Sequence, residues 1–415
     1  MSLAVTYTEA TLTAHFKKLC LINLIFIIFA DAYIVYFLGG PGLMLMNLAK
    51  VINVVFFIYL VLRKNQKATT VLTALLFIPF CWMYLFQDSL FTGIMKSYAR
   101  ILPGLTFLYL DDNDKKYVAR LFIKGLYYSL IPALIVYPFV LLKINLPGFM
   151  MAHPRDGRMY KVTFGIVFNL VYVPQRIHGL FDEPGVTGTF CAFALFFFFP
   201  VLTRWQKRVF FLAGLFSWSM FFIVIVTPIY LYHLWKGGNK AVAGALSLII
   251  LAAAVGFLIW ANQAITRLTK HDFLYAQVLG RLKTNEQGQI VGVIDNRDAS
   301  WIFTQRIYEP FVKEGGPKYY LGSYFFGDYT GDKYPALSQR LFIFNYGFGL
   351  LLYVYFFFLV TLPVKKRSEL LVVMLFLGLG FYQRPQLFRA EYLTLIYGGI
   401  LLSNEYRKKL IASRT

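Results

Sequence analysis

Long, unbroken runs of apolar residues recur along the whole chain, separated by short polar segments. Each run is long enough for a helix, at about 1.5 Å per residue, to cross a hydrocarbon layer about 30 Å thick. The runs are continuous, whereas an outer-membrane barrel shows segments of about ten residues that alternate apolar and polar positions. The pattern therefore predicts an all-α polytopic integral membrane protein.

Ten ranges of the chain are predicted to cross the membrane or, in one crowded region, to cross it more than once: 19–38, 43–62, 69–87, 91–110, 121–142, 186–201, 205–260, 340–362, 369–383 and 388–403. The first range is too long to be the apolar core of a removable signal peptide, so it is expected to be the first span.

Basic residues cluster at the ends of these spans: Lys17/Lys18, Arg63/Lys64/Lys67, Lys115/Lys116/Arg120, Arg204/Lys207/Arg208, Lys365/Lys366/Arg367 and Arg407/Lys408/Lys409. The positive-inside rule places these clusters, and both termini, on the cytoplasmic side. Lys236 and Lys240 belong to the same side, yet the segment after Arg208 is too short for two full crossings.

We therefore predict a pair of half-length helices that turns on the outer side near "FSWSM", Phe216 to Met220. Non-helical backbone at membrane depth is tolerated where protein buries it or where it lines a wet cavity, so this turn is expected beside a site. The pair brings the count to about 12 transmembrane helices.

The chain divides into five segments by this topology: N-terminal transmembrane helices 1–142, a first long periplasmic loop 143–185, central transmembrane helices 186–260, a second long periplasmic loop 261–339, and C-terminal transmembrane helices with a basic cytoplasmic tail 340–415. Both long loops face the non-cytoplasmic side. Loops of this length in a compact protein are usually functional or disordered, and the aromatic content of the second argues against disorder.

The composition supports an integral membrane protein and argues against a nucleic-acid partner. Of the 415 residues 58% are hydrophobic and only 15% are charged, as expected for a chain that is mostly in lipid. The net charge of +21 comes largely from the clusters at span ends, so topology explains it better than nucleic-acid binding. Cys20, Cys81 and Cys191 all lie inside apolar runs without close spacing, which indicates neither a disulfide framework nor a metal site.

Arginines in the outer loops oppose the topological bias and need another explanation. Arg155 and Arg158 lie in the first loop, and Arg297 and Arg306 lie in the second. An arginine fork binds phosphate oxygens through two parallel hydrogen bonds, so a diphosphate at the membrane surface is a natural partner. Weaker substrate-binding candidates are Tyr324, in an aromatic stretch suited to sugar faces or to the membrane interface, and Arg384, a charge at membrane depth.

The segment "VPQRIHGLFDEPGVTG", Val173 to Gly188, concentrates polar residues immediately before a span. Its turns bring Arg176, His178, Asp182 and Glu183 together at a helix N-terminus, whose free N–H groups favour an anion. The segment is suited to hold an anionic head group beside a working carboxylate. In the alternative interpretation these residues only cap and turn the chain, and Arg176 reaches lipid phosphates.

The stretch "RIHGLFDEPGVTGTF" resembles the R-x-x-G-x-F-x-E-P-x-x-x-G pattern of bacterial O-antigen and capsular polysaccharide polymerases of the Wzy type, a family related to the O-antigen ligases. "FSWSM" looks like the serine-containing turn of the paired short helices in that family. The later stretch that begins "GSYFFGDYTG" is similar to the long outer loop that leads into a late span, so the resemblance covers roughly residues 160 to 365.

The resemblance implies a glycosyltransferase of the C-type membrane fold in the bacterial inner membrane, with its active site facing the periplasm. Such an enzyme moves a growing glycan from undecaprenyl diphosphate to the non-reducing end of another lipid-linked repeat unit. Donor and acceptor oligosaccharides, membrane lipids and possible chain-length regulator proteins are the implied partners. The family is understood to need no metal or other cofactor, and no metal-ligand motif stands in the outer loops.

The resemblance also implies roles for particular residues. Arg176 would bind the donor diphosphate, and Glu183 would orient or deprotonate the attacking sugar hydroxyl, although His178 stays open as the base. A second arginine is expected among Arg297, Arg306 and Arg340, the last at the head of a span.

Two other functions remain open at this point. An O-antigen ligase, which transfers glycan to the lipid A core, would share the fold and the donor. A flippase or transporter of lipid-linked oligosaccharide would also need basic cavity residues, but it would need binding groups on both sides of the membrane, whereas both long loops are predicted on one side.

Overall fold

The computed structural model is mostly helical. It describes residues 2–30, 39–64, 102–152, 159–164, 167–171, 176–181, 183–265, 279–285, 289–293, 361–383 and 389–413, with the single residues 313 and 359. Within this described part, three helices are long and apolar enough to cross a membrane: Gly39–Arg63, Asp112–Leu141 and Lys240–Ala264. Shorter apolar helices accompany them, which indicates a membrane-embedded protein.

The N-terminal helices differ in their limits from the predicted spans. Helix α1 covers Ser2–Ala30, so it begins well before residue 19, and α3 covers Gly39–Lys64. Helix α6, Asp112–Leu141, begins before the basic cluster Lys115/Lys116/Arg120 and contains it, whereas the predicted span starts at residue 121. Asp112 and Asp114 in its first turn complement the partial positive charge of a helix N-terminus, which explains the earlier start.

Four helices form the centre of the chain: α7 (Pro184–Phe197), α8 (Arg204–Phe216), α9 (Met220–Lys236) and α10 (Lys240–Ala264). Thr203 and Gln206 form a capping box that starts α8. Helices α8 and α9 are both shorter than a full span and meet at residues 217–219, where the sequence analysis expects the turn of a helix pair.

Helix α7 is the core of the described structure. Every residue from Thr187 to Phe197 is buried, because α8, α9, the C-terminal π-helix and the helix that follows it pack against α7, and Phe122 of α6 meets Phe190. A helix that is apolar on all sides belongs inside a bundle. At 14 residues it is about 21 Å long, which is shorter than a hydrocarbon layer about 30 Å thick.

The C-terminal helices pack against α7. Helix α16 covers Arg367–Gln383, and α17 (Ala390–Leu393) continues through a π-helix, Thr394–Gly398, into α18 (Gly399–Ala412). Gly398 lies directly on Ala119 of α6, where an added Cβ would stand 2.5 Å from the alanine methyl carbon. This close approach brings the π-helix against α6.

The expectation of an all-α protein is wrong in detail, because both long loops contain short antiparallel strands. In the first loop, β1 (Gly148–Ala152), β2 (Met159–Thr163) and β3 (Val167–Leu170) form a sheet in sequence order. In the second loop, β4 (Leu282–Thr284) and β5 (Ile290–Val293) form a hairpin after the short 3-10 helix Leu279–Arg281.

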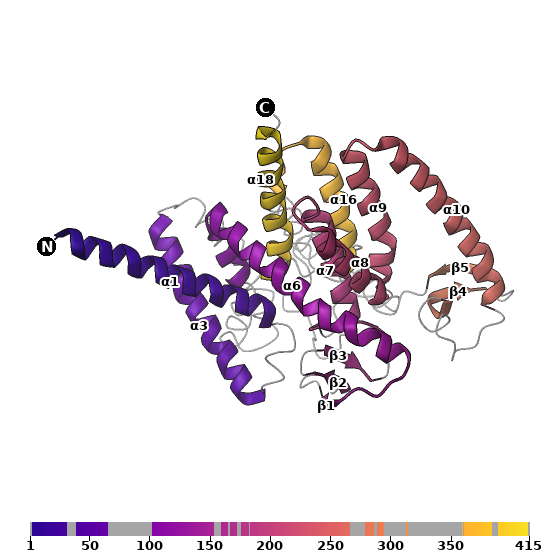
Figure 1. Cartoon of the computed structure of the whole chain (residues 1–415), viewed down its shortest axis with the longest axis horizontal. Coiled ribbons are helices and arrows are strands. Elements are labelled where there is room, and N and C mark those ends of the chain that lie inside the picture. The colour runs from indigo at the N-terminus through magenta and orange to yellow at the C-terminus, as the bar shows by residue number, and fades with distance from the viewer. Residues whose placement is uncertain are drawn as a thin grey trace.

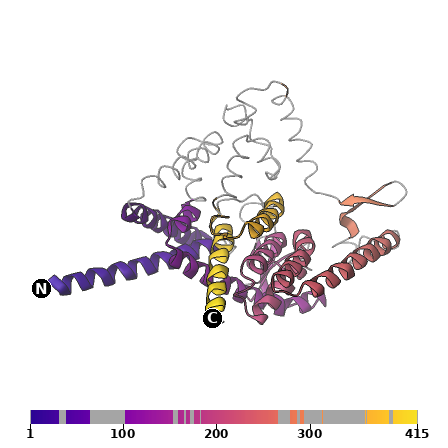
Figure 2. The ribbon, with the colours of Figure 1, turned by 90° about the horizontal axis from the view of Figure 1, so that it is seen from above.

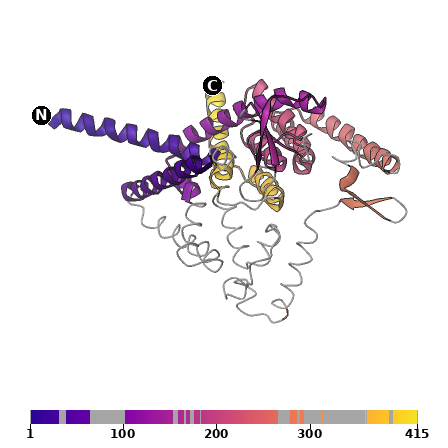
Figure 3. The same cartoon turned by 90° about the horizontal axis from the view of Figure 1, so that it is seen from below.

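The sheet and the basic clusters lie at opposite ends of the molecule. The ends of α9, α16 and α18 that carry Lys236, Arg367 and Arg407 lie at the top of Figure 1, and β1–β3 lie at the bottom. Figures 2 and 3 show α1 and the β4–β5 hairpin at opposite edges of the structure. The start of α7 and the α8–α9 turn belong to the same end as the sheet. Tyr160 of β2 meets His178 with ring centroids 6.1 Å apart, and the Ile177 N–H donates a hydrogen bond of 3.0 Å to the Phe216 carbonyl oxygen.

Candidate functional site

Arg176 joins two segments that the sequence analysis treats separately. Its Nε donates a hydrogen bond of 2.9 Å to the carbonyl oxygen of Ser217, and its Nη2 donates one of 2.9 Å to that of Trp218. These carbonyls belong to the end of α8, where a helix carries partial negative charge that a cation stabilises. The arginine therefore fixes the α8–α9 turn to the segment that leads into α7.

Gly188 brings α7 against the same turn. A Cβ at this position would stand 2.4 Å from Ser219 Cβ and 2.7 Å from Ser217 Oγ, so no other residue fits without a shift. Ser217 Oγ donates to the carbonyl oxygen of Gly214 at 2.6 Å, which fixes its orientation. The glycine at the end of the segment Val173 to Gly188 is thus explained by a close approach between helices.

Trp218 makes the turn rigid. It has φ of 51°, a left-handed conformation that is uncommon for a bulky residue and costs on the order of 1 kcal/mol or more. Its indole Nε1 donates to the Tyr137 hydroxyl at 3.1 Å, and the Phe216 and Tyr137 rings stack with centroids 4.7 Å apart. Sequence reasoning missed Tyr137 and Trp218, because their contact joins residues far apart in the chain.

Glu183 occupies the N-cap position of α7, with extended backbone angles, and Pro184 follows as the first helical residue. The carbonyl oxygen of Glu183 accepts the N–H of Val186 at 3.0 Å, and its side chain is partly exposed and makes no cap hydrogen bond. The structure thus places the carboxylate of Glu183 at the N-terminus of α7. The partial positive charge of a helix N-terminus favours an anion, although Pro184 has no N–H and the Val186 N–H is already bonded to Glu183.

His178 lies in a different environment. Only 1% of the residue is exposed, its ring meets the edge of Tyr160 with centroids 6.1 Å apart, and its carbonyl oxygen accepts the Thr187 hydroxyl at 2.6 Å. Gly179, with φ of 62°, turns the chain directly after it. A general base must reach the proton that it removes, so the placement favours Glu183 over His178 for that role.

The structure brings together Arg176, His178 and Glu183 at the start of α7. The remaining candidates lie outside the described residues: Asp182, Arg155, Arg158, Arg297, Arg306, Arg340, Tyr324 and Arg384. Within the described residues there is no group of three or more His, Cys, Asp or Glu side chains that could hold a metal ion.

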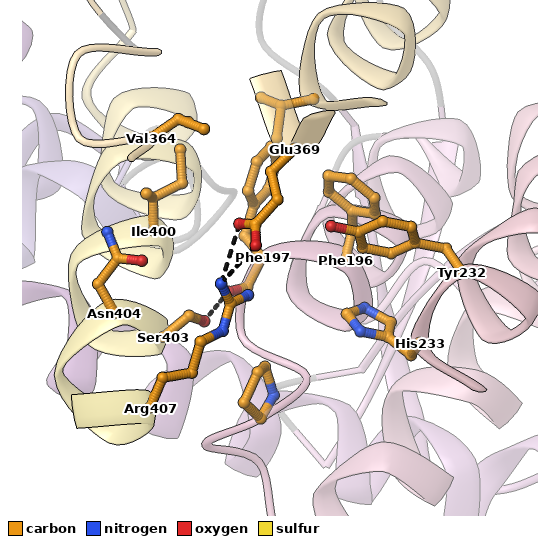
Figure 4. Close-up of a pocket in the computed structure, with 12 residues that line it drawn as sticks. Phe196, Phe197, Tyr232, His233, Val364, Glu369, Ile400, Ser403, Asn404 and Arg407 are labelled. Carbon is orange, nitrogen blue, oxygen red and sulfur yellow. Dashed lines mark hydrogen bonds and ion pairs between the residues drawn. The ribbon is translucent and has the colours of Figure 1, made fainter. Parts of the chain in front are cut away.

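A second polar cluster lies at the opposite end of the helices (Figure 4). Glu369 accepts Lys236 Nζ at 2.8 Å, and Arg407 Nη1 points at the same carboxylate at 2.9 Å. The adjoining cavity, lined by Phe196, His233 and Ser403 among others, measures about 30 Å³. That volume has room for two or three water molecules, since a water needs about 10–15 Å³. The ion pairs of the cluster join α9, α16 and α18.

Comparisons of the chain with protein-family models, with curated proteins and with solved structures each return no match. The candidate site is therefore assigned from its own geometry and from the resemblance of the motif that forms it.

Proposed function

We propose that this protein is a glycosyltransferase of the O-antigen polymerase type, which transfers a glycan from undecaprenyl diphosphate to another lipid-linked repeat unit. The observation that carries the proposal is the meeting of Arg176, Glu183 and the α8–α9 turn at one end of a buried central helix. A cation, a carboxylate and a helix N-terminus are the groups that such a transfer needs.

In the proposed reaction, a hydroxyl oxygen of the acceptor sugar attacks the anomeric carbon of the donor. The new carbon–oxygen bond forms as the bond to the diphosphate breaks, and the bonding electrons leave with undecaprenyl diphosphate. Glu183 takes the hydroxyl proton, a role that typically contributes about 10²–10⁴-fold to a rate. The partial positive charge at the start of α7 and the charge of Arg176 offset the charge that develops on the leaving diphosphate.

Arg176 has two tasks in this scheme. Two of its guanidinium N–H groups hold the turn, which keeps the start of α7 in place. Its charge remains at that end of the helix, where it attracts a diphosphate. Because the turn sits where α8 and α9 are both short, the site lies below the surface of a bilayer about 30 Å thick, at a depth that suits a lipid-linked substrate.

The test is to mix the purified protein with its lipid-linked repeat unit, without nucleotide and in EDTA, and to resolve the products on a gel. A ladder from the wild type that is lost in Glu183→Gln supports the proposal. Glu405→Gln, a carboxylate change at the opposite end of the helices, is the matched control and should leave the ladder intact. A normal ladder from Glu183→Gln would show that Glu183 only caps α7 and takes no part in catalysis. A wild type that makes no ladder would favour a flippase or a ligase.

A further inference from the structure

Helix α8 begins with basic residues and no acidic one. Arg204 is its first residue, Lys207 and Arg208 follow within the next four positions, and its first turn contains no carboxylate. The partial positive charge of a helix N-terminus repels cations, so this placement costs stability. The capping box of Thr203 and Gln206 starts the helix but supplies no negative charge to offset the cations.

Other helices that begin beside basic clusters follow the usual rule. Asp112 and Asp114 lie in the first turn of α6, and Glu369 lies in the first turn of α16. Helix α10 resembles α8 instead, because it begins with Lys240 and has no acidic residue in its first turn. The positive-inside rule explains on which side of the membrane such cations lie. It does not explain why two helices begin with cations and no carboxylate.

The cations at the starts of α8 and α10 are not neutralised by the chain around them. Between Glu183 and Asp272 the sequence contains no aspartate or glutamate. Among the described residues, no carboxylate forms an ion pair with any of these four cations. By contrast, Lys236 at the end of α9 pairs with Glu369 of α16 at 2.8 Å. An anion from outside the described chain would offset the charge of the four.

Contacts through α9 bring the starts of α8 and α10 to the same end of the molecule. Lys207 Nζ lies 3.9 Å from the centroid of the Phe199 ring, and Phe199 stacks on His233 with ring centroids 4.0 Å apart. His233 lies in the last turn of α9, which ends at Lys236, and α10 begins four residues later at Lys240. These cations therefore belong to one basic surface, made of Arg204, Lys207, Arg208 and Lys240.

Two exposed tryptophans indicate the level of this basic surface in a membrane. Trp205 is 67% exposed and Trp235 is 58% exposed. The Arg208 guanidinium carbon lies 4.8 Å from the ring centroid of Trp205, and Lys240 Nζ lies 5.7 Å from that of Trp235. Tryptophan is enriched where a membrane meets water, at the level of lipid head groups. The anion that lies at this level is a lipid phosphate.

We propose that the basic surface binds the head group of an anionic phospholipid, phosphatidylglycerol, in the cytoplasmic leaflet. The guanidinium forks of Arg204 and Arg208 donate parallel hydrogen bonds to phosphate oxygens, and the ammonium groups of Lys207 and Lys240 add charge. Basic residues beside a span attract the anionic lipids of that leaflet. The bound phosphate offsets the repulsion between these cations and the two helix N-termini. The inference is independent of the proposed function, which concerns the opposite end of the helices.

The experiment measures lipid binding to the purified, delipidated full-length protein by native mass spectrometry. Arg204→Gln/Arg208→Gln should bind phosphatidylglycerol about 30-fold more weakly than the wild type, as expected when two basic residues are lost beside a membrane surface. Phosphatidylethanolamine, whose head group has no net charge, should bind weakly and equally to both proteins. Equal affinity of the wild type for the two lipids would overturn the inference, as would unchanged affinity of the variant for phosphatidylglycerol.

Melting temperatures in a neutral detergent without lipid give a second measurement. Arg204→Gln/Arg208→Gln should melt at the same temperature as the wild type or higher, because two cations are removed from a helix N-terminus. Added phosphatidylglycerol should then raise the melting temperature of the wild type more than that of the variant. A variant that melts lower than the wild type without lipid would contradict the repulsion on which the inference rests.

Lys18→Gln/Lys408→Gln is the matched control. Both lysines are exposed and make no ion pair with the described residues, and their replacement removes the same net charge, but they lie on α1 and α18. This variant should bind phosphatidylglycerol as the wild type does. An equal loss of affinity in the two double variants would show that net charge alone attracts the lipid, and would overturn a site at the starts of α8 and α10.

Discussion

Individual residues around α7 explain the composition of the segment Val173 to Gly188. Gly188 is needed because Ser217 and Ser219 occupy the place of a side chain, and Arg176 is needed because two carbonyl oxygens end α8 beside it. Arg176 and Glu183 could be singled out from the sequence, since they lie together in a polar segment of a predicted outer loop, where arginine opposes the topological bias. The hydrogen bonds of Arg176 and the contact between Trp218 and Tyr137 could not be predicted from the sequence, because they join residues about 40 to 80 positions apart in the chain.

Replacing Gly188 by alanine tests the close approach. The added methyl group would overlap Ser219, so the variant should lose about 1–3 kcal/mol of unfolding free energy, the usual cost of overpacking. Thermal unfolding in detergent measures this loss. Gly244→Ala on α10, where nothing lies within 4 Å, is the control and should leave the melting temperature equal or raise it. Equal stability of the two variants would contradict the packing described for α7.

At the scale of elements, charge counting predicts a turn near residues 216–220, and the structure has two short helices, α8 and α9, separated at residues 217–219. That the turn lies on the outer side stays a prediction, which rests on two basic clusters on one side requiring an even number of crossings. The sequence did not predict β1–β3, because strands of four or five residues in a polar loop show too little alternation of apolar and polar positions to be recognised. It also placed the start of α6 too late, because a basic cluster is compatible with helix as well as loop.

The junction between α6 and α18 predicts a pH dependence. Glu405 accepts Lys409 at 2.9 Å and Lys116 at 3.1 Å, and these hydrogen bonds lower its pKa to about 2 from 4.5. A lowered pKa in the folded state stabilises the protein fully above about pH 4.5, and this contribution is lost as the pH falls toward 2.

Melting temperatures of the wild type and of Glu405→Gln, measured from pH 7 to pH 3, test this junction. At pH 7 the difference should be small, about 1 kcal/mol or less, because the pair is partly exposed. The difference should shrink below pH 4.5. A difference that grows as the pH falls would show that Glu405 is not held as a carboxylate.

For the whole molecule, the important feature is the separation of two ends. The Glu369 and Glu405 networks lie at the end that carries the basic clusters, and Arg176, Glu183 and the β1–β3 sheet lie at the other. The positive-inside rule could predict this separation from sequence, because it depends on the positions of charges and not on contacts. It predicts that the site faces away from the cytoplasm.

Cysteine labelling in spheroplasts tests that orientation. In a chain whose natural cysteines are replaced by alanine, Val171→Cys, which is exposed after β3, should react with a membrane-impermeant maleimide. Lys408→Cys, exposed near the end of α18, should react only after the membrane is permeabilised. Labelling of Lys408→Cys in intact spheroplasts would contradict the proposed topology, because it would place the end of α18 outside the cytoplasm.

The most direct measurement of the central claim is the initial rate at which undecaprenyl diphosphate is released from the lipid-linked repeat unit by the wild type and by Glu183→Gln. The account predicts that the variant, with an unchanged melting temperature, is slower by about 10²-fold or more, because the carboxylate accepts the proton of the attacking hydroxyl. Equal rates would contradict it and leave the start of α7 without a catalytic group.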